Sequence, residues 1–566
     1  MRPERQWLPP ATESLDPAAR ERAIDIAQRE GLHPIVVQVL LQRGLADDEL
    51  GSYLNPQVAN LHDPLALRGM DAGVRVMDEA IRSGRKITIY GDYDVDGTTA
   101  TAALISYLRH AGADVDYFIP MRLAGYGITT DALDNIWADQ KPELLISVDC
   151  GVKSRAEVEY AKRLGMSVIV TDHHLPAPGK TPLGIVINPH LEEDEYPFKD
   201  IAGVAVAYKL IAAHYGSQPV GNLDLVAMGT VSDVMPLLDE NRAIVAYGLQ
   251  KLAQTKRPGL AALIDTVGLK GERRQQLTSS DLGYRIGPRI NAVGRMGLDP
   301  NLVVELLTTT DPERGRELAI MLDNANKQRQ QQTDGLVKQA MTMVDPSDRF
   351  IVLEMDLFAG VAGIVAGRVV EEYNRPAIVL DRNGHGSGRS IDGVPLITLE
   401  GTGVLDEFAG ELWVGGGHSY ACGVKQLPRG VEELRRALNA STRIPAELAA
   451  PIRQIDALCK LSDVNENLLA SLRRLEPTGK ENESVTLMVS NVEVVSERRM
   501  GTDQQHYACV VRDDSLAASE TRRAVFFRAG DLPSQLGQYV DIAFSPEWDD
   551  YAGGVQLMVK DLRTTA

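Results

Sequence analysis

Between residues 86 and 187, five short runs of β-branched and aliphatic residues alternate with longer stretches, several of helical spacing. Strands that alternate with helices in this way build right-handed βαβ units and a largely parallel sheet. A second and smaller set of the same kind follows at residues 350–425, after a polar-faced helical stretch without strong stop signals. The five predicted strands are Lys86–Tyr90, Val115–Pro120, Leu144–Val148, Ser167–Val170 and Gly184–Ile187.

The two ends of the chain differ from this α/β texture. Residues 1–66 have mostly helical spacing. From about residue 452 onward, short strands such as Val485–Val489 and Val492–Val495 are separated by turn signals, which predicts a small β-barrel. The predicted fold class is therefore α/β, with two α/β domains joined by a long helix and followed by a C-terminal barrel.

Three of the predicted strands end in acidic or imidazole residues. The first runs into Gly91–Gly97 (GDYDVDG), the third into Asp149, and the fourth into Asp172 and two histidines. Ligands of an open parallel sheet bind beyond the carboxyl ends of its strands. We therefore expect one crevice to collect the side chains of Asp94, Asp96, Asp149, Asp172, His173 and His174. A further carboxylate, Asp233, lies in an otherwise apolar run, where it also needs a cation or a hydrogen-bond donor beside it.

The acidic cluster predicts a site for hard divalent cations. A calcium-binding EF-hand is rejected, because the twelfth position counted from Asp92 is Ala103 and not the required Glu. So many carboxylates are costly to pack together unless cations neutralise them. Oxygen ligands with one or two imidazoles fit Mn²⁺ as well as Mg²⁺. Two such ions can activate a water and clamp a phosphodiester, which predicts phosphoester or phosphoanhydride hydrolysis. The chain has no Walker A sequence, so ATP-driven motion is not supported.

The overall charge restricts how nucleic acid could be held. The chain carries 59 Lys and Arg against 78 Asp and Glu, a net charge of −19, which excludes binding by bulk positive charge. The four cysteines contain no CxxC pair, and the first residues (MRPERQWLPP) lack the apolar core of a signal peptide. No apolar run is long enough to span a membrane. We expect a cytoplasmic protein.

In the order and spacing of its motifs the sequence resembles the DHH phosphoesterase superfamily, named for the Asp-His-His motif at residues 172–174. More closely it is similar to the RecJ family of bacterial single-strand-specific 5′→3′ DNA exonucleases. The motifs are GDYDVDG, GYG, VDCG, TDHH, YPFKDIAGVAVAYK, DLVAMGTVSDVMPL, GPRINAVGRM, GSGRS and GGGH. The resemblance implies a helical extension (1–66), a DHH catalytic domain (67–310), a connecting helix (311–345), a DHHA1 substrate-binding domain (346–447) and an OB-like domain (452–566).

The resemblance also implies roles for individual residues. Asp94 and Asp96, with Asp92 beside them, would bind two divalent ions that Asp149 bridges, and His173 and Asp233 would complete one coordination shell. Asp172 and His174 would support these ligands or face the substrate. Tyr126 would stack on a base. The remaining substrate-binding positions, which include a grip on a 5′ phosphate, are Arg122, Arg289, Asn291, Arg295, Ser387, Arg389 and His418.

Three positions depart from the family pattern. Tyr90 stands where many relatives place a histidine, which predicts a weaker metal site or more reliance on Asp92. Phe358 replaces a histidine that could face the substrate. Residues 477–482 (PTGKEN) differ from the usual PFGxGN at the junction with the barrel.

The resemblance implies metal-dependent 5′→3′ degradation of single-stranded DNA in recombination and repair. It also implies a nucleoid-associated monomer whose partners are single-strand-binding protein, a helicase and mismatch-repair factors. Two alternatives remain. One is a DHH phosphodiesterase for short oligoribonucleotides or cyclic dinucleotides, which would resemble only the two α/β domains. The other is a non-catalytic scaffold, whose relatives lose the metal-binding Asp and His that this chain retains.

Overall fold

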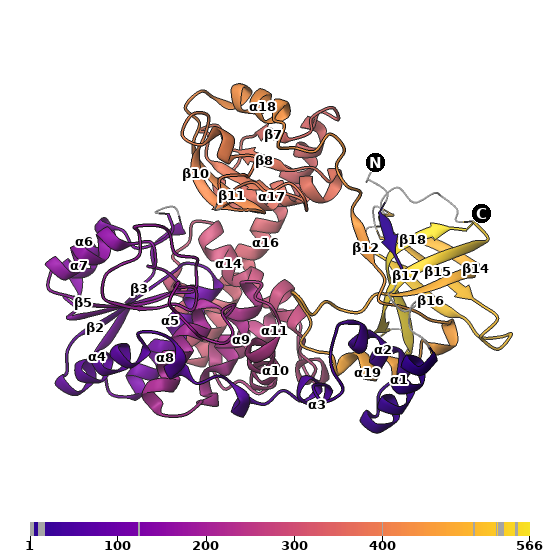
Figure 1. Ribbon diagram of the computed structural model, residues 1–566, viewed down its shortest axis with the longest axis horizontal. Coiled ribbons are helices and arrows are strands. Elements are labelled where there is room, and N and C mark those ends of the chain that lie inside the picture. The colour runs from indigo at the N-terminus through magenta and orange to yellow at the C-terminus, as the bar shows by residue number, and fades with distance from the viewer. Residues whose placement is uncertain are drawn as a thin grey trace.

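The structure is a computed structural model that describes residues 5–9, 17–122, 125–398, 400–501, 504–527, 529, 537–549 and 553–565. Figure 1 shows three bodies: a large α/β domain, a smaller α/β domain above it, and a barrel to one side that carries the first helices of the chain. Among the described residues, no helix is both long and apolar enough to cross a membrane.

The first sheet is wholly parallel, with the strand order β3-β2-β4-β5-β6. The chain leaves β2 toward β3 on one side and returns to β4 on the other, so the strand order reverses between β2 and β4. In doubly wound sheets this reversal opens the crevice where ligands bind. The strands are β2 (Ile87–Gly91), β3 (Val115–Phe118), β4 (Leu144–Val148), β5 (Ser167–Thr171) and β6 (Ile185–Ile187).

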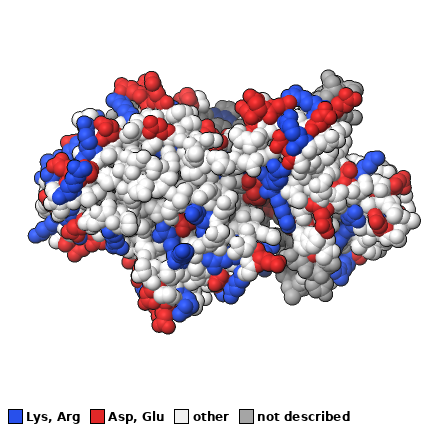
Figure 2. All heavy atoms as spheres, turned by 90° about the horizontal axis from the view of Figure 1, so that it is seen from below, with Lys and Arg blue, Asp and Glu red and all other residues white. Residues whose placement is uncertain are grey.

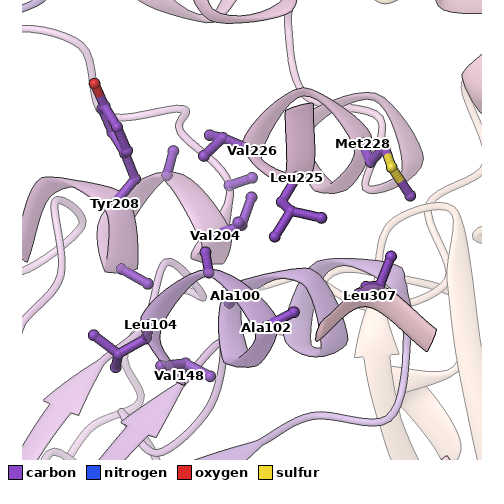
Figure 3. Close-up of a cluster of buried hydrophobic side chains, with 14 of the residues drawn as sticks. Ala100, Ala102, Leu104, Val148, Val204, Tyr208, Leu225, Val226, Met228 and Leu307 are labelled. Atoms are coloured by element: carbon purple, nitrogen blue, oxygen red, sulfur yellow. The ribbon is translucent and has the colours of Figure 1, made fainter. Parts of the chain in front are cut away.

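Helices α5 (Val95–His110), α8 (Gly203–Tyr215) and α9 (Leu223–Ser232) form the centre of the first domain. Figure 3 shows their small and aliphatic side chains meeting, with Ala100 and Ala102 from α5 facing Val204 and Leu225. The small residues let the helices approach closely, and that closeness brings the N-terminal ends of α5 and α8 and the C-terminal end of α9 to the sheet edge. The other helices of this domain are α4 (Met70–Ser83), α6 (Thr130–Asp139), α7 (Arg155–Arg163), α10 (Asp239–Ala253), α11 (Pro258–Thr266), α12 (Glu272–Gln275), α13 (Ser279–Asp281), the π-helix η6 (Leu282–Ile286), α14 (Gly287–Arg295) and α15 (Asn301–Thr308).

The 32-residue helix α16 (Pro312–Met343) leads from the first α/β domain to the second, as the predicted fold class requires. The second domain has a mixed sheet in the order β10-β11-β9-β8-β7, in which only β7 and β8 are parallel. Its elements are β7 (Ile351–Glu354), α17 (Ala359–Tyr373), β8 (Ala377–Leu380), β9 (Gly386–Arg389), β10 (Val414–His418), β11 (Ala421–Gln426) and α18 (Val431–Ala440).

The C-terminal sheet closes into a barrel in the order β14-β15-β16-β18-β17, because β17 also pairs with β14. This closed five-strand order is that of the OB fold. The prediction of two strands at Val485–Val489 and Val492–Val495 is wrong, since one strand with a register shift between Val489 and Val492 covers both. The strands are β13 (Ala457–Leu458), β14 (Leu487–Met500), β15 (His506–Arg512), β16 (Arg522–Phe526), β17 (Tyr539–Trp548) and β18 (Val555–Thr564).

The N-terminal segment packs on the barrel at the opposite end of the chain. Apolar side chains of α1 (Pro17–Glu30) and α2 (Pro34–Gln42) share one buried core with those of the barrel strands and α19 (Glu466–Arg473). Strand β1 (Gln6–Leu8) pairs in parallel with β12 (Ile452–Gln454). The described part of the extension and the barrel therefore form one unit, and α3 (Leu50–Leu54) leads from it to the first α/β domain.

Arg242 of α10 joins three parts of the chain. Its buried guanidinium donates hydrogen bonds to the backbone carbonyls of Tyr53, Leu475, Glu476 and Pro477 at 2.9–3.2 Å and lies 3.8 Å from the centre of the Tyr53 ring. Because four carbonyls depend on one side chain, Arg242 fixes the start of the barrel against the first α/β domain.

Candidate active site

The carboxyl ends of β2, β4 and β5 bring the predicted acidic and imidazole residues together at the strand-order reversal. His173, which follows β5, lies at the centre of the cluster. Its Nε2 atom is 3.2 Å from Asp149 Oδ1, 3.4 Å from Asp233 Oδ2 and 3.8 Å from Asp96 Oδ2. Three strand ends and the C-terminal end of α9 thus supply one compact set of side chains.

The backbone around Asp149 is shaped to aim its carboxylate into this set. Asp149 has a φ of +59°, a left-handed conformation that is uncommon outside glycine and typical of functional sites. Gly203, the first residue of α8, packs so closely that a Cβ there would lie 2.6 Å from the Cβ and Oδ1 atoms of Asp149. Gly229 of α9 is equally confined, with a Cβ position 2.7 Å from Asp96 Oδ1. Both glycines leave room for the two carboxylates.

The N-termini of two helices donate hydrogen bonds to two of the carboxylates that follow β2. Asp94 caps α5 by accepting hydrogen bonds from the amides of Asp96 and Gly97, at 2.9 and 3.2 Å. Asp96 accepts hydrogen bonds from the amides of Gly203 and Val204 at the start of α8, at 2.7 and 2.8 Å. These N–H groups favour negative charge and fix the direction of each carboxylate.

Asp172 and His174 form a second layer behind the cluster. Asp172 accepts hydrogen bonds from the amides of Val152, His173 and His174, and its Oδ1 lies 2.8 Å from His174 Nδ1. Burial alone would raise the pKa of Asp172, but the hydrogen bond from His174 and its charge hold that pKa below its ordinary value. The hydroxyl of Tyr126 donates to the Asp149 carbonyl at 3.1 Å, and its ring centre lies 4.9 Å from that of His174.

Without cations the cluster is electrostatically unfavourable. Burial, followed by the charge of Asp94, raises the pKa of Asp96 to about 7 and that of Asp92 well above its ordinary range. Burial and the charges of Asp96 and Asp94 raise the pKa of Asp149 strongly and that of Asp233 to about 9. Burial, with the charge of His174, lowers the pKa of His173 to about 3, so its imidazole is neutral at pH 7 and can act as a ligand.

The donor set fits hard divalent ions. Asp92 Oδ1, Asp149 Oδ1 and His173 Nε2 are buried and lack hydrogen-bond partners in the described part of the chain. Buried polar atoms are normally paired, so three such atoms in one cluster point to a cation site. Ligand atoms lie within 4.8 Å of one another in three groups: Asp96, His173 and Asp233; Asp92, Asp94 and Asp149; and Asp149, His173 and His174. Asp149 and His173 each belong to two of these groups, and of the two only the carboxylate has two oxygens that two ions could share.

Three arginines from separate parts of the chain converge beside the acidic cluster. Arg122 follows β3 and lies over the ring of Tyr93 at 4.9 Å, Arg295 ends α14, and Arg389 ends β9 of the second α/β domain. Burial, followed by the charges of Arg122, Arg329 and Arg389, lowers the pKa of Arg295 to about 9. A Cβ on Gly294, next to Arg295, would lie 3.6 Å from Arg122 Cβ. Helix α17 holds both Gly360, whose carbonyl accepts a hydrogen bond from Arg295 at 2.9 Å, and Gly363, where a Cβ would lie 2.9 Å from the Arg389 guanidinium. The three cations therefore approach one another, in an arrangement suited to a phosphate.

The other predicted substrate residues lie around this arginine cluster or on its elements. Ser387 is half-buried on β9, and the charge of Arg389 acts on His418 at the end of β10. Asn291 is half-buried on α14. Arg289 donates to Asp323 of α16 at 2.9 Å and to the Arg285 carbonyl, so the structure engages its guanidinium in a helix–helix contact.

The structure also places two of the three departures from the family pattern, Tyr90 and Phe358. Tyr90 is fully buried, and its hydroxyl donates to the Gly127 carbonyl at 3.0 Å, so it supports the loop that carries Tyr126. Phe358 precedes α17 and is 39% exposed. The close approach of Gly360 to its ring and to the Arg295 carbonyl puts Phe358 next to the arginine cluster.

Away from these clusters the surface charge is mixed. Figure 2 shows acidic and basic side chains interspersed over the described part of the lower face. On this face no charge of one sign gathers, whereas the acidic and arginine clusters each collect one sign of charge.

Two family models match separate parts of the chain. The model for the DHH family N-terminal domain matches residues 86–230, which contain β2 to β6 and the ends of all strands that supply the acidic cluster. The model for the RecJ OB domain matches residues 455–561, the barrel.

Curated relatives cover nearly the whole chain. The single-stranded-DNA-specific exonuclease RecJ of Bacillus subtilis is 34% identical over 555 residues, covering 94% of this chain and 68% of the relative. The chain belongs to the RecJ family. The RecJ exonuclease of Thermus thermophilus is 33% identical over 83% of this chain and 67% of its own length. The chain thus spans about two thirds of the length of these relatives.

Solved structures of RecJ agree with the fold and with the metal-binding chemistry. The crystal structure of RecJ with Mn²⁺ from Thermus thermophilus matches with a TM-score of 0.82 and 28% identity, over all of this chain and 80% of the other. The corresponding Mg²⁺ complex matches with a TM-score of 0.76 and 27% identity. Both ions are those that the carboxylate and imidazole donors of this chain fit.

Sequence reasoning missed the packing partners of the predicted site. Gly203 and Gly229 were not singled out, although each lies in a motif that the sequence analysis used. A glycine inside an apolar helical run is a signal of close approach, and this signal could have identified both.

Proposed function

We propose that this chain is a metal-dependent exonuclease that degrades single-stranded DNA from its 5′ end, with a role in recombination and repair. The observation that supports it most is the juxtaposition of unpaired buried metal-ligand atoms with a cluster of half-buried arginines. One cluster suits divalent ions and the other suits a phosphate. Membership of a family whose curated members are named single-stranded-DNA-specific exonucleases supports the choice of substrate.

In this proposal six side chains hold two Mn²⁺ or Mg²⁺ ions: Asp92, Asp94, Asp96, Asp149, His173 and Asp233. Bound ions of this kind lower the pKa of a water and neutralise the oxygens of a phosphodiester. Asp149 would be shared between both ions, because it groups with Asp92 and Asp94 while its Oδ1 lies 3.2 Å from Nε2 of His173, a ligand of the other group. Asp233, with 29% of its side chain exposed, lies on the open side where the substrate approaches. His174, oriented by Asp172, faces the reacting phosphodiester.

The polarity follows from an anchored strand end. Arg295, Arg389 and Ser387 hold the 5′-terminal phosphate, and Tyr126 stacks on a base at the entrance to the acidic cluster. The anchored end determines which phosphodiester reaches the metal ligands. Water then adds to that phosphorus as the P–O bond to the terminal nucleotide breaks, which releases nucleotides one at a time from the 5′ end.

The two alternative functions have less support. A phosphodiesterase for short oligoribonucleotides or cyclic dinucleotides has no need of a barrel, whereas residues 455–561 match the RecJ OB domain. A scaffold without catalytic activity has no need of unpaired buried ligand atoms at Asp92, Asp149 and His173.

End-labelled digestion tests the proposal. With Mn²⁺, a 5′-phosphorylated single strand should yield labelled mononucleotide at once when the label is at the 5′ end. A 3′ label should give progressively shorter fragments. Chelator or Asp149→Ala should abolish both patterns. An intact single strand alongside degradation of a dinucleotide would favour the phosphodiesterase, and no degradation of either would favour the scaffold.

The family resemblance supports a further set of associations. Single-strand-binding protein, a helicase and mismatch-repair factors are the proposed partners of a nucleoid-associated, cytoplasmic monomer. Co-purification of each candidate with the full chain, and sedimentation of the chain alone, test these associations separately.

A further inference from the structure

A tight turn at residues 479–482 lies between the first α/β domain and the barrel, in the loop after α19 that contacts the segment following α9 (Figure 1). The amide of Gly479 donates to the Asn482 carbonyl at 2.9 Å, and the amide of Asn482 donates to the Gly479 carbonyl at 3.1 Å. Glu481 has a φ of +59°, and both Lys480 and Glu481 are exposed at the tip of this turn. The turn coincides with the PTGKEN departure from the family pattern.

The turn is fixed against the segment that carries Asp233. The amide of Leu237 donates to the Lys480 carbonyl at 2.9 Å, and a Cβ on Gly479 would lie 2.8 Å from Leu237 Cδ1. The buried Asn482 accepts a hydrogen bond from the Tyr53 hydroxyl at 2.7 Å and donates to the Pro477 carbonyl at 2.8 Å. The backbone of Lys480 is therefore held against Leu237, which lies four residues after the proposed metal ligand Asp233.

The Lys480 ammonium is free to bind something else. Within the described residues it makes no hydrogen bond or ion pair. The hydrogen bond from the Leu237 amide holds the Lys480 backbone against the segment that follows Asp233, and the chain runs on from this turn into β14 of the barrel. Burial, then the charges of Arg389 and Lys480, lower the pKa of His418 at the end of β10. Lys480 therefore lies where the first domain meets the barrel.

The part of the chain that forms the barrel has a negative net charge, since residues 452–566 hold 13 Lys and Arg against 18 Asp and Glu. An unpaired cation at the start of this region is suited to bind a backbone phosphate of a single strand.

We propose that Lys480 binds a backbone phosphate of the single strand where the strand passes from the candidate metal centre toward the barrel. This rests on the proposed function and adds a substrate-binding residue to it. The contact depends on the positive charge of the side chain and not on the conformation of the turn. An arginine at position 480 should therefore bind the phosphate, whereas a glutamine should not.

Steady-state kinetics of the full chain on a 5′-phosphorylated single strand test the contact. Lys480→Gln should raise KM about five- to tenfold with kcat within twofold, and should lower the slope of log KM against log salt by roughly 0.7, the value for one phosphate contact to a single strand. Lys480→Arg should restore both values. Two controls should keep the wild-type KM: Lys270→Gln removes an exposed lysine elsewhere in the first domain, and Glu481→Gln alters the same turn.

A series of strands, each with one neutral methylphosphonate, locates the phosphate. At one position of the strand, the methylphosphonate should raise the KM of the wild-type protein by the same factor as Lys480→Gln does. The same methylphosphonate should not raise the KM of the Lys480→Gln variant any further. Failure of wild-type protein to degrade the strand would refute the proposed function. Degradation by wild-type protein with unchanged KM and salt slope in Lys480→Gln would overturn only the role of Lys480. A KM rise shared by Glu481→Gln, or a lowered melting temperature, would also overturn it, because the turn itself would then be the cause.

Discussion

Adding one methyl group to Gly203 should displace the proposed bridging ligand Asp149. The new Cβ would lie 2.6 Å from Asp149 Cβ and Oδ1. Ordinary contacts between such atoms begin near about 3.4 Å, so Asp149 or the start of α8 must move by roughly 0.8 Å. Misplacement of a reacting group by about 1 Å costs on the order of 10²-fold in rate. Gly203→Ala should therefore lower kcat about 100-fold, with an overpacking cost of about 1–3 kcal/mol in stability.

The assay is hydrolysis of a 5′-phosphorylated single strand over a Mn²⁺ titration, with the melting temperature measured on the same preparations. Gly335→Ala is the matched control. Gly335 also lies in a helix, is exposed, and has open space where the Cβ would go. This control should keep the wild-type kcat and stabilise α16 by about 0.5–1 kcal/mol. The reasoning would be refuted by a folded Gly203→Ala protein with wild-type kcat and wild-type Mn²⁺ dependence.

Three further predictions follow from the same contacts. In metal-free protein the pKa of Asp96 is about 7, against an ordinary value near 4. The folded state then keeps a proton that the unfolded chain releases, so stability should fall as the pH rises from about 4 to 7. The loss is about 4 kcal/mol for three pKa units. Melting curves at pH 5 and 8 with chelator should show the part of this loss that falls between pH 5 and 7, about 3 kcal/mol, and Mn²⁺ at pH 8 should reverse it; equal melting temperatures would argue against the raised pKa of Asp96. Arg242→Met should destabilise the chain by about 3 kcal/mol, because four carbonyls lose their donor. Arg75→Met, which removes an exposed ion pair, should change stability by less than about 1 kcal/mol, and an equal effect of both would contradict the role given to Arg242. Tyr126→Ala should weaken single-strand binding by about 1–3 kcal/mol, whereas Tyr126→Phe should keep most of the affinity. Fluorescence anisotropy of a labelled strand measures both affinities, and equal losses of affinity in the two variants would assign the effect to the hydroxyl.

The parts of the fold that local sequence determines were predictable. β2, β4 and β5 are short aliphatic runs, and the acidic residues that follow them lie together because parallel strands end at the same edge. Asp149 and His173 could be placed in one site on that ground alone. The closed barrel was predictable as an architecture, but its first strand was not, because the register shift after Val489 interrupts the alternation on which the prediction depended.

Contacts between distant parts of the chain left no local signal. Trp7 donates a hydrogen bond to Asp561, 554 residues away, and the apolar face of α2 gives no indication that a C-terminal barrel will cover it. Lys480 shows the same limit within the site. Its segment was recognised only as a departure from a motif, and its position beside Asp233 depends on Leu237, Tyr53 and Asn482, which are scattered through the sequence.

Locating bound manganese by anomalous X-ray diffraction tests the central claim most directly. Crystals soaked in Mn²⁺ should give two anomalous peaks about 4 Å apart, one among Asp96, His173 and Asp233 and the other among Asp92, Asp94 and Asp149. Crystals of Asp149→Ala should lose at least one of them. Peaks at other positions, or no peak in this cluster at Mn²⁺ concentrations that support digestion, would contradict the account.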